Sequence, residues 1–426
     1  MVRCLDDLTI TTAKEGAREY SKVSYPIRYG IYDEIKTRDH IFQFNLLGEI
    51  RHIQGRRGEW PNSGEWLKRS EGNDWAYYSS GNYSGIFERF GEYYFPCLSY
   101  PSNSIMGEKP FRERGVQRAF HALEELQKQV TRIKARGVPA EIGAFLERLA
   151  GWGGDALALR AEQFHRIIGG PVSVLPPDAR HADYDVIPLF LVDGCLYRCG
   201  FCSVKSGREL TLRTRESLIE QLAGLKRFYG PELQNYNALF LGQHDTLCAG
   251  PEVIEFAAQA AYGALGFKDS FMRRPTLFLF GSVDSLLDAR ERLFQLLDTM
   301  PFFTYVNVGL ESSDGVTLDL LKKPVSPAKV RDAFARMLDI NRRYERIEVS
   351  ANFVIGLGLP EGHLASILQL SAECRGLFSG KGTLYISPLA EDRMMRREEA
   401  RAFLAQFDRA KAGGMLPTYL YLIQRL

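Results

Sequence analysis

Three cysteines within eight residues are the part of this sequence that most clearly could do chemistry. Cys195, Cys199 and Cys202 have the spacing Cys-x3-Cys-x2-Cys. Thiolates are soft ligands that favour iron–sulfur clusters, zinc or copper. An ordinary cluster or a structural zinc site would use four ligands, and no fourth cysteine or histidine lies nearby in the sequence. The spacing therefore predicts a cluster with one iron left open for a bound molecule.

Two other interpretations of these cysteines remain open at this point. A structural zinc site could be completed by a distant ligand such as Cys248 or His244, or the spacing could be fortuitous. The chain has seven cysteines, an odd number, and only these three are close together. That pattern suits a metal site in a reducing compartment better than a set of disulfides.

Composition excludes few classes of function. The chain has 426 residues, 45% of them hydrophobic and 25% charged, as is ordinary for a globular protein. Lysine and arginine number 54 against 52 acidic residues, a net charge of +2, so nothing requires a nucleic-acid partner. Because no secretory signal and no membrane span can be recognised, we expect a soluble, cytoplasmic protein.

The cysteine segment falls within a regular alternation of strand and helix patterns. Strand-like runs are predicted at Val186–Val192, Ala238–Leu241, Thr276–Phe280, Thr304–Leu310, Glu348–Ile355 and Thr383–Ile386. Helical patterns are predicted at Arg215–Phe228, Pro251–Ala264, Ser285–Leu297, Lys329–Tyr344, Leu364–Cys374 and Arg397–Ala412. Six such units predict an α/β fold with parallel strands, either a six-unit partial (β/α) barrel or an open doubly wound sheet. In both, ligands bind at the carboxyl ends of the strands.

The N-terminal part of the chain has a different character. An aromatic-rich stretch from about Tyr77 to Tyr100 precedes helical patterns at Gly115–Arg136 and Pro139–Leu149. We expect an α+β accessory domain over residues 1–180 that shapes the substrate site, the catalytic domain over 181–390, and a C-terminal helix and tail over 391–426. Leu175–Asp178 is interpreted as the linker between the first two.

The cysteine motif directly after the first predicted strand resembles the radical S-adenosylmethionine (SAM) superfamily. The aromatic Phe201 before the last cysteine is similar to that family as well. The resemblance implies a partial TIM barrel and a 4Fe-4S cluster whose open iron binds SAM. Reductive cleavage of SAM would then give a 5′-deoxyadenosyl radical that abstracts hydrogen from a substrate.

Other strand ends extend the resemblance and imply contacts to SAM. Val308-Gly-Leu-Glu-Ser-Ser313 resembles a motif of the branch that contains oxygen-independent coproporphyrinogen oxidases, which implies that Glu311 contacts the cosubstrate. Phe353 to Glu361 is similar to an adenine-contacting turn. The implied cofactor-binding residues are Phe201, Gly242, Gln243, His244, Ser282, Glu311, Ile355 and Gly356. His244 stands near a usual glycine, and a hydrogen-bonded loop histidine is an equal alternative there.

The predicted function is therefore that of a radical SAM enzyme acting on a small-molecule substrate. A low-potential electron donor of the flavodoxin or ferredoxin type would supply the electron. The substrate and the reaction after hydrogen abstraction are not encoded in these motifs. The alternatives are a non-catalytic haem carrier on the same fold and a zinc-stabilised binding protein.

Overall fold

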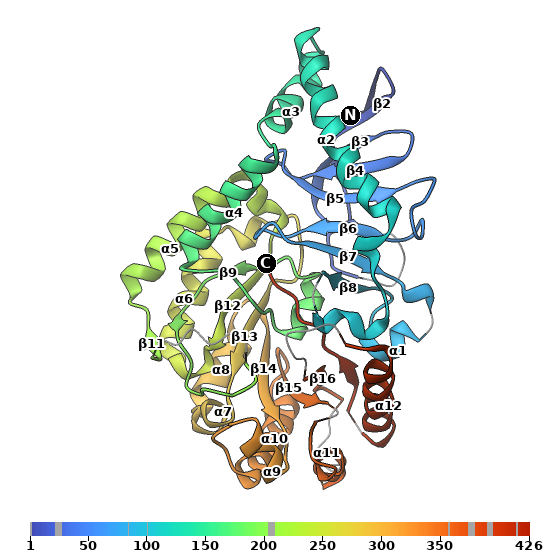
Figure 1. Cartoon of the computed structure of the whole chain (residues 1–426). Helices are drawn as coiled ribbons and strands as arrows, with labels where there is room; N and C mark the ends of the chain where they lie inside the picture. Colours follow the sequence, from blue (N-terminus) through green and yellow to red (C-terminus); the bar gives the residue numbers. More distant parts are fainter. Residues whose placement is uncertain are drawn as a thin grey trace.

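The computed structural model describes residues 2–21, 28–83, 85–99, 101–202, 209–356, 358–373, 380–389, 395–414 and 416–426. An antiparallel sheet occupies the N-terminal part and a parallel sheet the remainder (Figure 1). Two predicted residues, Leu357 in the glycine-rich turn and Cys374 at a helix end, lie outside the described residues.

The N-terminal sheet has eight strands, ordered as they occur in the sequence and all antiparallel to their neighbours. They are β1 (Val2–Leu5), β2 (Leu8–Glu15), β3 (Ile31–Lys36), β4 (His40–Phe44), β5 (Ile50–Gly55), β6 (Trp66–Arg69), β7 (Trp75–Ser79) and β8 (Phe95–Leu98). Apolar side chains such as Leu8, Ile10, Ile35 and Ile53 are buried on it. Local pairing of successive strands explains this order, because short connections favour antiparallel neighbours.

Short helices and turns follow the first sheet and lead to three longer helices. They are η1 (Gly81–Tyr83), α1 (Ile86–Phe90), η2 (Pro101–Met106), η3 (Pro110–Arg112), α2 (Arg114–Ala135), α3 (Ala140–Ala150) and α4 (Gly154–Ile168). Helix α2 buries Val116, Leu123, Leu126 and Val130, which recur at helical spacing, and it packs against β4 and β5. No helix in the described part of the chain has the length and apolar composition needed to cross a bilayer.

The second sheet has seven strands, all parallel, in the order β17-β16-β15-β14-β13-β12-β9. They are β9 (Ile187–Pro188), β12 (Ala238–Asp245), β13 (Thr276–Gly281), β14 (Phe303–Glu311), β15 (Ile347–Ile355), β16 (Leu384–Pro388) and β17 (Thr418–Leu420), and a separate hairpin pairs β10 (Val192–Asp193) with β11 (Thr211–Leu212). The strand order follows the sequence, so right-handed crossovers place the connecting helices on one face. The other face we call the inner face.

The crossover helices account for most of the remaining chain (Figure 1). They are α5 (Arg215–Tyr229), α6 (Pro251–Ala264), α7 (Val283–Asp288), α8 (Glu291–Thr299), α9 (Gly315–Leu320), α10 (Pro327–Arg343), α11 (Gly362–Glu373) and α12 (Arg397–Gly413), with turns η5 (Gly230–Asn235), η6 (Leu247–Ala249) and η7 (Phe267–Asp269). The α/β class and the parallel sheet are confirmed.

Three details of the prediction were wrong. The sheet has seven strands rather than six, because the three-residue β17 is too short to leave a sequence pattern. The single helix predicted over Ser285–Leu297 is two helices, since a capping box at Ser282 starts α7 and the chain leaves helical geometry at Ala289. The first strand, expected over Val186–Val192, is only two residues long.

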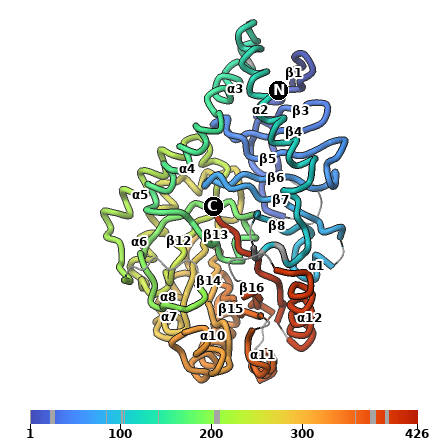
Figure 2. Tube along the Cα trace, viewed as in Figure 1, coloured from blue at the N-terminus to red at the C-terminus, as the bar shows by residue number. Residues whose placement is uncertain are grey.

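The segment interpreted as a linker is part of the core instead. Leu175 is buried, and Pro177 begins a buried 3-10 turn, η4 (Pro177–Ala182), that packs against β13 and β14. The C-terminal tail returns to the same region, where Gln424 accepts a hydrogen bond from the Leu175 N–H and donates one to the Pro96 carbonyl. Figure 2 shows this tail ending between the two sheets. The C-terminal tail therefore joins β8 of the N-terminal sheet to the segment that precedes η4.

Candidate functional site

The cysteine motif lies between the two strands of the small hairpin, at the carboxyl end of β10. Cys199 is buried, and Cys195 and Cys202 are half-buried. The Gly200 N–H donates to the Leu321 carbonyl over 2.8 Å, which attaches the loop to the end of α9. Burial raises the pKa of the Cys199 thiol to about 11, and the nearby Lys323 ammonium opposes that shift.

Glu311 lies beside this loop in a strained conformation. It ends β14 with a φ of 66°, a left-handed value that costs a side-chain-bearing residue about 1 kcal/mol or more. The residue is 9% exposed, and burial raises the pKa of its carboxyl group. A Cβ on Gly309 would come within 2.4 Å of Glu311 Oε1, so the glycine leaves room for this carboxylate.

The partner of Glu311 is a buried lysine that the sequence motifs did not identify. Lys323 is 6% exposed, and its Nζ lies 3.7 Å from Glu311 Oε1. The same ammonium lies 5.2 Å from the centre of the Tyr197 ring, inside the cysteine motif. At 3.7 Å the pair is an ion pair rather than a hydrogen bond. The one sequence feature that could have identified Lys323 is its position shortly after the strand end at Glu311.

Tyr197 connects the cysteine loop to the first turn of α7, the helix that follows β13. Its hydroxyl donates to Asp284 Oδ2 over 2.6 Å and accepts from the Asp284 N–H over 3.1 Å. Lys329 binds the other Asp284 oxygen at 2.6 Å. Burial and the bond to Asp284 raise the pKa of Tyr197, which keeps the phenol protonated. Asp284 thus positions the loop that carries the cysteines.

The end of β12 holds three of the residues proposed from sequence, and their surroundings differ. Gly242 has a φ of 122°. Gln243 binds the chain at residues 171–173, accepting from the Ser173 N–H over 2.7 Å and donating to the Pro171 carbonyl over 3.0 Å. Both ends of its amide are thus used within the protein. His244 is buried, which lowers its pKa and keeps the ring neutral.

Asp245, next to His244, is incompletely paired. Its Oδ1 accepts from Ser285 Oγ over 2.8 Å, while its Oδ2 is buried and accepts no hydrogen bond from the described residues. Burial raises its pKa. Cys248 Sγ donates to the Asp245 carbonyl over 2.8 Å, and burial raises the pKa of that thiol to about 12.

The remaining proposed residues have structural partners. Ser282 accepts the Ser285 N–H over 3.0 Å as the cap of α7. Ile355 is buried at the end of β15, and its carbonyl accepts from Leu389. A Cβ on Gly356 would lie 3.0 Å from Leu389 Cβ. Phe201 lies half-buried in the cysteine loop. Their roles toward SAM remain predictions.

The cysteine loop has the donor chemistry that a cluster requires. In the parts of the chain that the structure describes, no three cysteine, histidine or acidic side chains are already gathered as metal ligands. The Cys195 and Cys202 thiols nevertheless lie close enough to Cys199 to raise its pKa, and the charged Lys323 and Glu311 side chains are near that thiol as well. The residue types therefore fit an iron–sulfur cluster, whose binding would draw the three sulfurs together.

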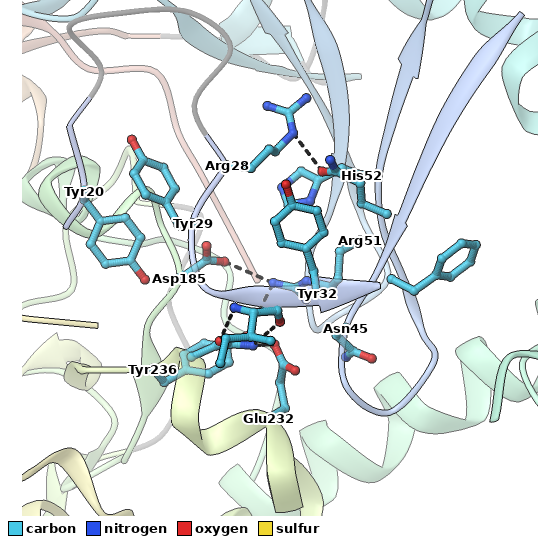
Figure 3. Close-up of a pocket in the computed structure, with 14 residues that line it drawn as sticks. Tyr20, Arg28, Tyr29, Tyr32, Asn45, Arg51, His52, Asp185, Glu232 and Tyr236 are labelled. Carbon is cyan, nitrogen blue, oxygen red and sulfur yellow. Dashed lines mark hydrogen bonds and ion pairs between the residues drawn. The ribbon is translucent and has the colours of Figure 1, made fainter. Parts of the chain in front are cut away.

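A different pocket lies at the amino ends of the parallel strands, between the two sheets (Figure 3). Tyr20 and Tyr29 lie on one side, and Arg28, Tyr32 and His52 on the other. Arg51, which lines it, already binds Glu71 at 2.6 Å and Asp185 at 3.0 Å. This pocket is remote from the cysteine loop, at the opposite ends of the strands.

Contacts between the N-terminal domain and the rest of the chain also lie at the amino ends of the parallel strands. Leu46 binds Glu232, Ile31 binds Asn235, and Arg18 binds the Phe271 carbonyl, all before β12 or β13 begins. The predicted role of residues 1–180 as a cover for the substrate site remains a prediction. At the end of that range, η4 packs against β13 and β14.

Comparison with known proteins gives one family. Residues 189–371 match the Radical SAM superfamily, and no curated protein matches the chain. A radical SAM methyltransferase from Sphaerobacter thermophilus aligns at 15% identity over 55% of this chain and 65% of its own, with a TM-score of 0.37. The cobalamin-dependent SAM radical enzyme OxsB with aqua-cobalamin bound aligns at 13% identity over 57% and 34%, with a TM-score of 0.35.

The Streptococcus suis protein SuiB bound to its precursor peptide SuiA aligns at 8% identity over 84% of this chain and 71% of its own, with a TM-score of 0.37. The match spans less than two thirds of the methyltransferase and of OxsB. These likenesses are too distant to bear on function, and the resemblance to coproporphyrinogen oxidases stays a prediction. The match to the Radical SAM superfamily over residues 189–371, less than half of the chain, supports SAM-dependent radical chemistry.

Proposed function

We propose that this chain is an enzyme that reductively cleaves SAM at a 4Fe-4S cluster held by Cys195, Cys199 and Cys202. The observation that carries the proposal is the cysteine loop beside the buried Glu311–Lys323 ion pair. When bound, the cluster and SAM supply one-electron chemistry, in which an electron breaks the S–C5′ bond to leave methionine and a radical that abstracts hydrogen.

The ion pair supplies both signs of charge that the amino-acid end of SAM requires. The Lys323 ammonium can bind the carboxylate of SAM, and the Glu311 carboxylate can accept hydrogen bonds from its amino group or ribose hydroxyls. Because both side chains are almost fully buried, each contact would be little weakened by water. Their present pairing keeps both charges compensated before the cosubstrate enters.

The loop contacts give the cysteines a fixed support on one side. Tyr197 bound to Asp284, and Gly200 bound to the end of α9, hold the loop backbone against two neighbouring elements. A loop held in this way can close around a cluster while water is kept from the reacting atoms.

The proposal extends to the substrate, the electron donor and the compartment. The substrate is a small molecule, the electron donor is flavodoxin-like or ferredoxin-like, and the compartment is reducing, as the cytoplasm is. The seven-stranded parallel sheet would form the partial barrel of this superfamily.

The test is to reconstitute the full-length protein anaerobically and to measure iron and SAM cleavage. We expect about four iron atoms per chain and 5′-deoxyadenosine formation with dithionite. Changing all three cysteines of the motif to alanine should abolish both, whereas Cys97→Ala, at a buried thiol in β8, should change neither. Iron that survives the triple change would overturn the proposal, and iron without SAM cleavage would favour a cofactor carrier.

A further inference from the structure

The chain makes a very tight turn at Glu311. The Ser312 N–H donates to the Leu310 carbonyl over 2.8 Å, which closes a three-residue turn around Glu311. A φ of 66° at the centre of such a turn is typical of the γ-turn with positive φ, which is rare because it is strained. A strained conformation of this kind persists only where the surrounding structure fixes it. The groups that fix this turn therefore take part in presenting the Glu311 carboxylate.

The residues that follow Glu311 are held by the first turns of two helices. Ser312 Oγ lies 2.9 Å from His363 Nδ1, and Ser313 Oγ donates to Ser366 Oγ over 3.0 Å. Both of these partners belong to α11. The Asp314 N–H donates to Ser312 Oγ over 3.0 Å, and Asp314 is the N-cap of α9. The end of the strained turn is thus fixed by side-chain hydrogen bonds on both sides.

His363 joins this turn to the neighbouring strand. It is 3% exposed, and its Nε2 lies 2.6 Å from the carbonyl oxygen of Val354 on β15. Because a carbonyl oxygen only accepts, Nε2 carries the proton, and Nδ1 of the neutral ring accepts from the Ser312 hydroxyl. Burial lowers the pKa of His363, which favours the neutral ring. Both ring nitrogens are therefore used, one at the end of β14 and one on β15.

The conformation of the turn decides where the Glu311 carboxylate lies. Its Oε1 occupies space beside Gly309, where a Cβ would come within 2.4 Å of it, and lies 3.7 Å from Lys323 Nζ. A return of Glu311 to the negative φ that residues with a side chain favour would swing the carboxylate out of that space. Ser312 shares a peptide unit with Glu311, so holding Ser312 in place opposes that return. The bond between Ser312 and His363 therefore helps to keep the carboxylate beside Lys323.

We propose that His363 is a positioning residue for SAM, which holds the strained turn through Ser312 and so keeps the Glu311 carboxylate directed at the cosubstrate. This inference rests on the proposed function for the identity of the bound molecule, whereas the fixing of the turn does not require it. His363 itself would contact neither SAM nor the cluster. Its substitution should therefore weaken SAM binding and leave the iron content unchanged.

Two substitutions separate the two ring nitrogens, and each gives up one hydrogen bond. In His363→Asn the side-chain oxygen takes the place of Nδ1 and can still accept from Ser312, whereas in His363→Gln the amide takes the place of Nε2 and reaches only Val354. In equilibrium dialysis of labelled SAM with the full-length, cluster-loaded protein, His363→Gln should weaken binding about five- to thirtyfold. His363→Asn should stay within about twofold of the unchanged protein. His121→Gln, at an exposed histidine on α2, is the matched control and should change nothing.

The effect on SAM should act through Glu311. In a Glu311→Ala background, His363→Gln should cause no further loss of SAM affinity, because the carboxylate that it positions is already gone. Ser312→Ala removes the other partner of the bond and should resemble His363→Gln, so the test does not depend on the folding of one variant. Normal SAM affinity in His363→Gln, or a loss of the same size with and without Glu311, would overturn the inference.

Amide hydrogen exchange of the full-length protein tests the turn without SAM. His363→Gln should speed exchange in the segment 309–316 by at least about tenfold, whereas His363→Asn should leave it near the rate of the unchanged protein. If the unchanged protein binds no SAM but this difference in exchange is seen, the proposed function fails and the fixing of the turn by His363 stands. Equal exchange in the two variants overturns the inference, whatever the SAM affinity.

Discussion

The buried Arg51 and Lys68 at the amino ends of the parallel strands form short ion pairs, whereas the buried Glu311–Lys323 pair at the carboxyl ends is longer. Arg51 binds Glu71 and Asp185, and Lys68 binds Asp185 at 2.7 Å and Asp183 at 3.2 Å. At the other end, Asp245 Oδ2 accepts no hydrogen bond from the described residues, and the Glu311–Lys323 distance is longer, 3.7 Å.

This difference indicates that the amino ends hold the N-terminal domain in place and that the carboxyl ends carry the candidate site. Paired, hydrogen-bonded charges fix the N-terminal domain on the parallel sheet, and their removal should cost stability. Strained and incompletely paired groups lower stability and persist where a ligand completes them. Substitutions at the amino ends should therefore lower the free energy of unfolding, whereas substitutions at the carboxyl ends should weaken SAM binding.

The largest effect should come from breaking the docking network. Arg51→Met leaves Glu71 and Asp185 as buried carboxylates without this partner, which should lower the free energy of unfolding by about 3–5 kcal/mol. Urea unfolding followed by circular dichroism measures this. Arg56→Met, at an exposed arginine a few residues along, should change it by less than about 0.5 kcal/mol. Equal losses in both variants would show that the network does not dock the domains.

A pH dependence of stability should also come from the amino ends. Burial raises the pKa of Glu232 to about 8, although hydrogen bonds from Leu46 and Asn235 oppose this. The folded state then binds a proton more tightly than the unfolded state, so its contribution is complete below about pH 4.5 and is lost as pH rises toward 8. We expect a loss of about 2–4 kcal/mol across that range. Unfolding curves for Glu232→Gln should lack this slope, and an unchanged slope would assign it to another group.

At the carboxyl ends the effect should fall on SAM instead. Glu311→Ala should weaken SAM binding about ten- to a hundredfold, which is roughly 1.5–3 kcal/mol for a charge-assisted hydrogen bond. Lys323→Met should do the same, and iron content should stay at the level of the unchanged protein in both. Equilibrium dialysis with labelled SAM gives the affinity. Unchanged affinity in either variant would remove that residue from the site.

A smaller effect should follow from a single methyl group. Gly309→Ala places a Cβ within 2.4 Å of Glu311 Oε1 and must displace that carboxylate, so SAM affinity should fall about three- to tenfold. Gly263→Ala on α6, where nothing lies within 4 Å, is the matched control. It should leave affinity unchanged and raise stability by about 0.5–1 kcal/mol. The same dialysis and unfolding measurements compare the two.

Much of the parallel sheet could be predicted because its strands are short apolar runs separated by amphipathic helices. The cysteine spacing likewise identified one loop, at the carboxyl end of β10, as the candidate site. The pairing of Lys323 with Glu311 and the burial of η4 could not be predicted, since both depend on contacts between segments distant in sequence. The N-terminal strands were largely missed because their alternation is interrupted by charged residues, such as Arg69, that are paired within the core.

The electron paramagnetic resonance spectrum of the dithionite-reduced, full-length protein with and without SAM tests the central claim most directly. If the cysteine loop holds a 4Fe-4S cluster whose open iron binds SAM, the reduced cluster gives a signal that changes when SAM is added. A cluster signal that SAM leaves unaltered, or the absence of any iron–sulfur signal after reconstitution, would contradict the account.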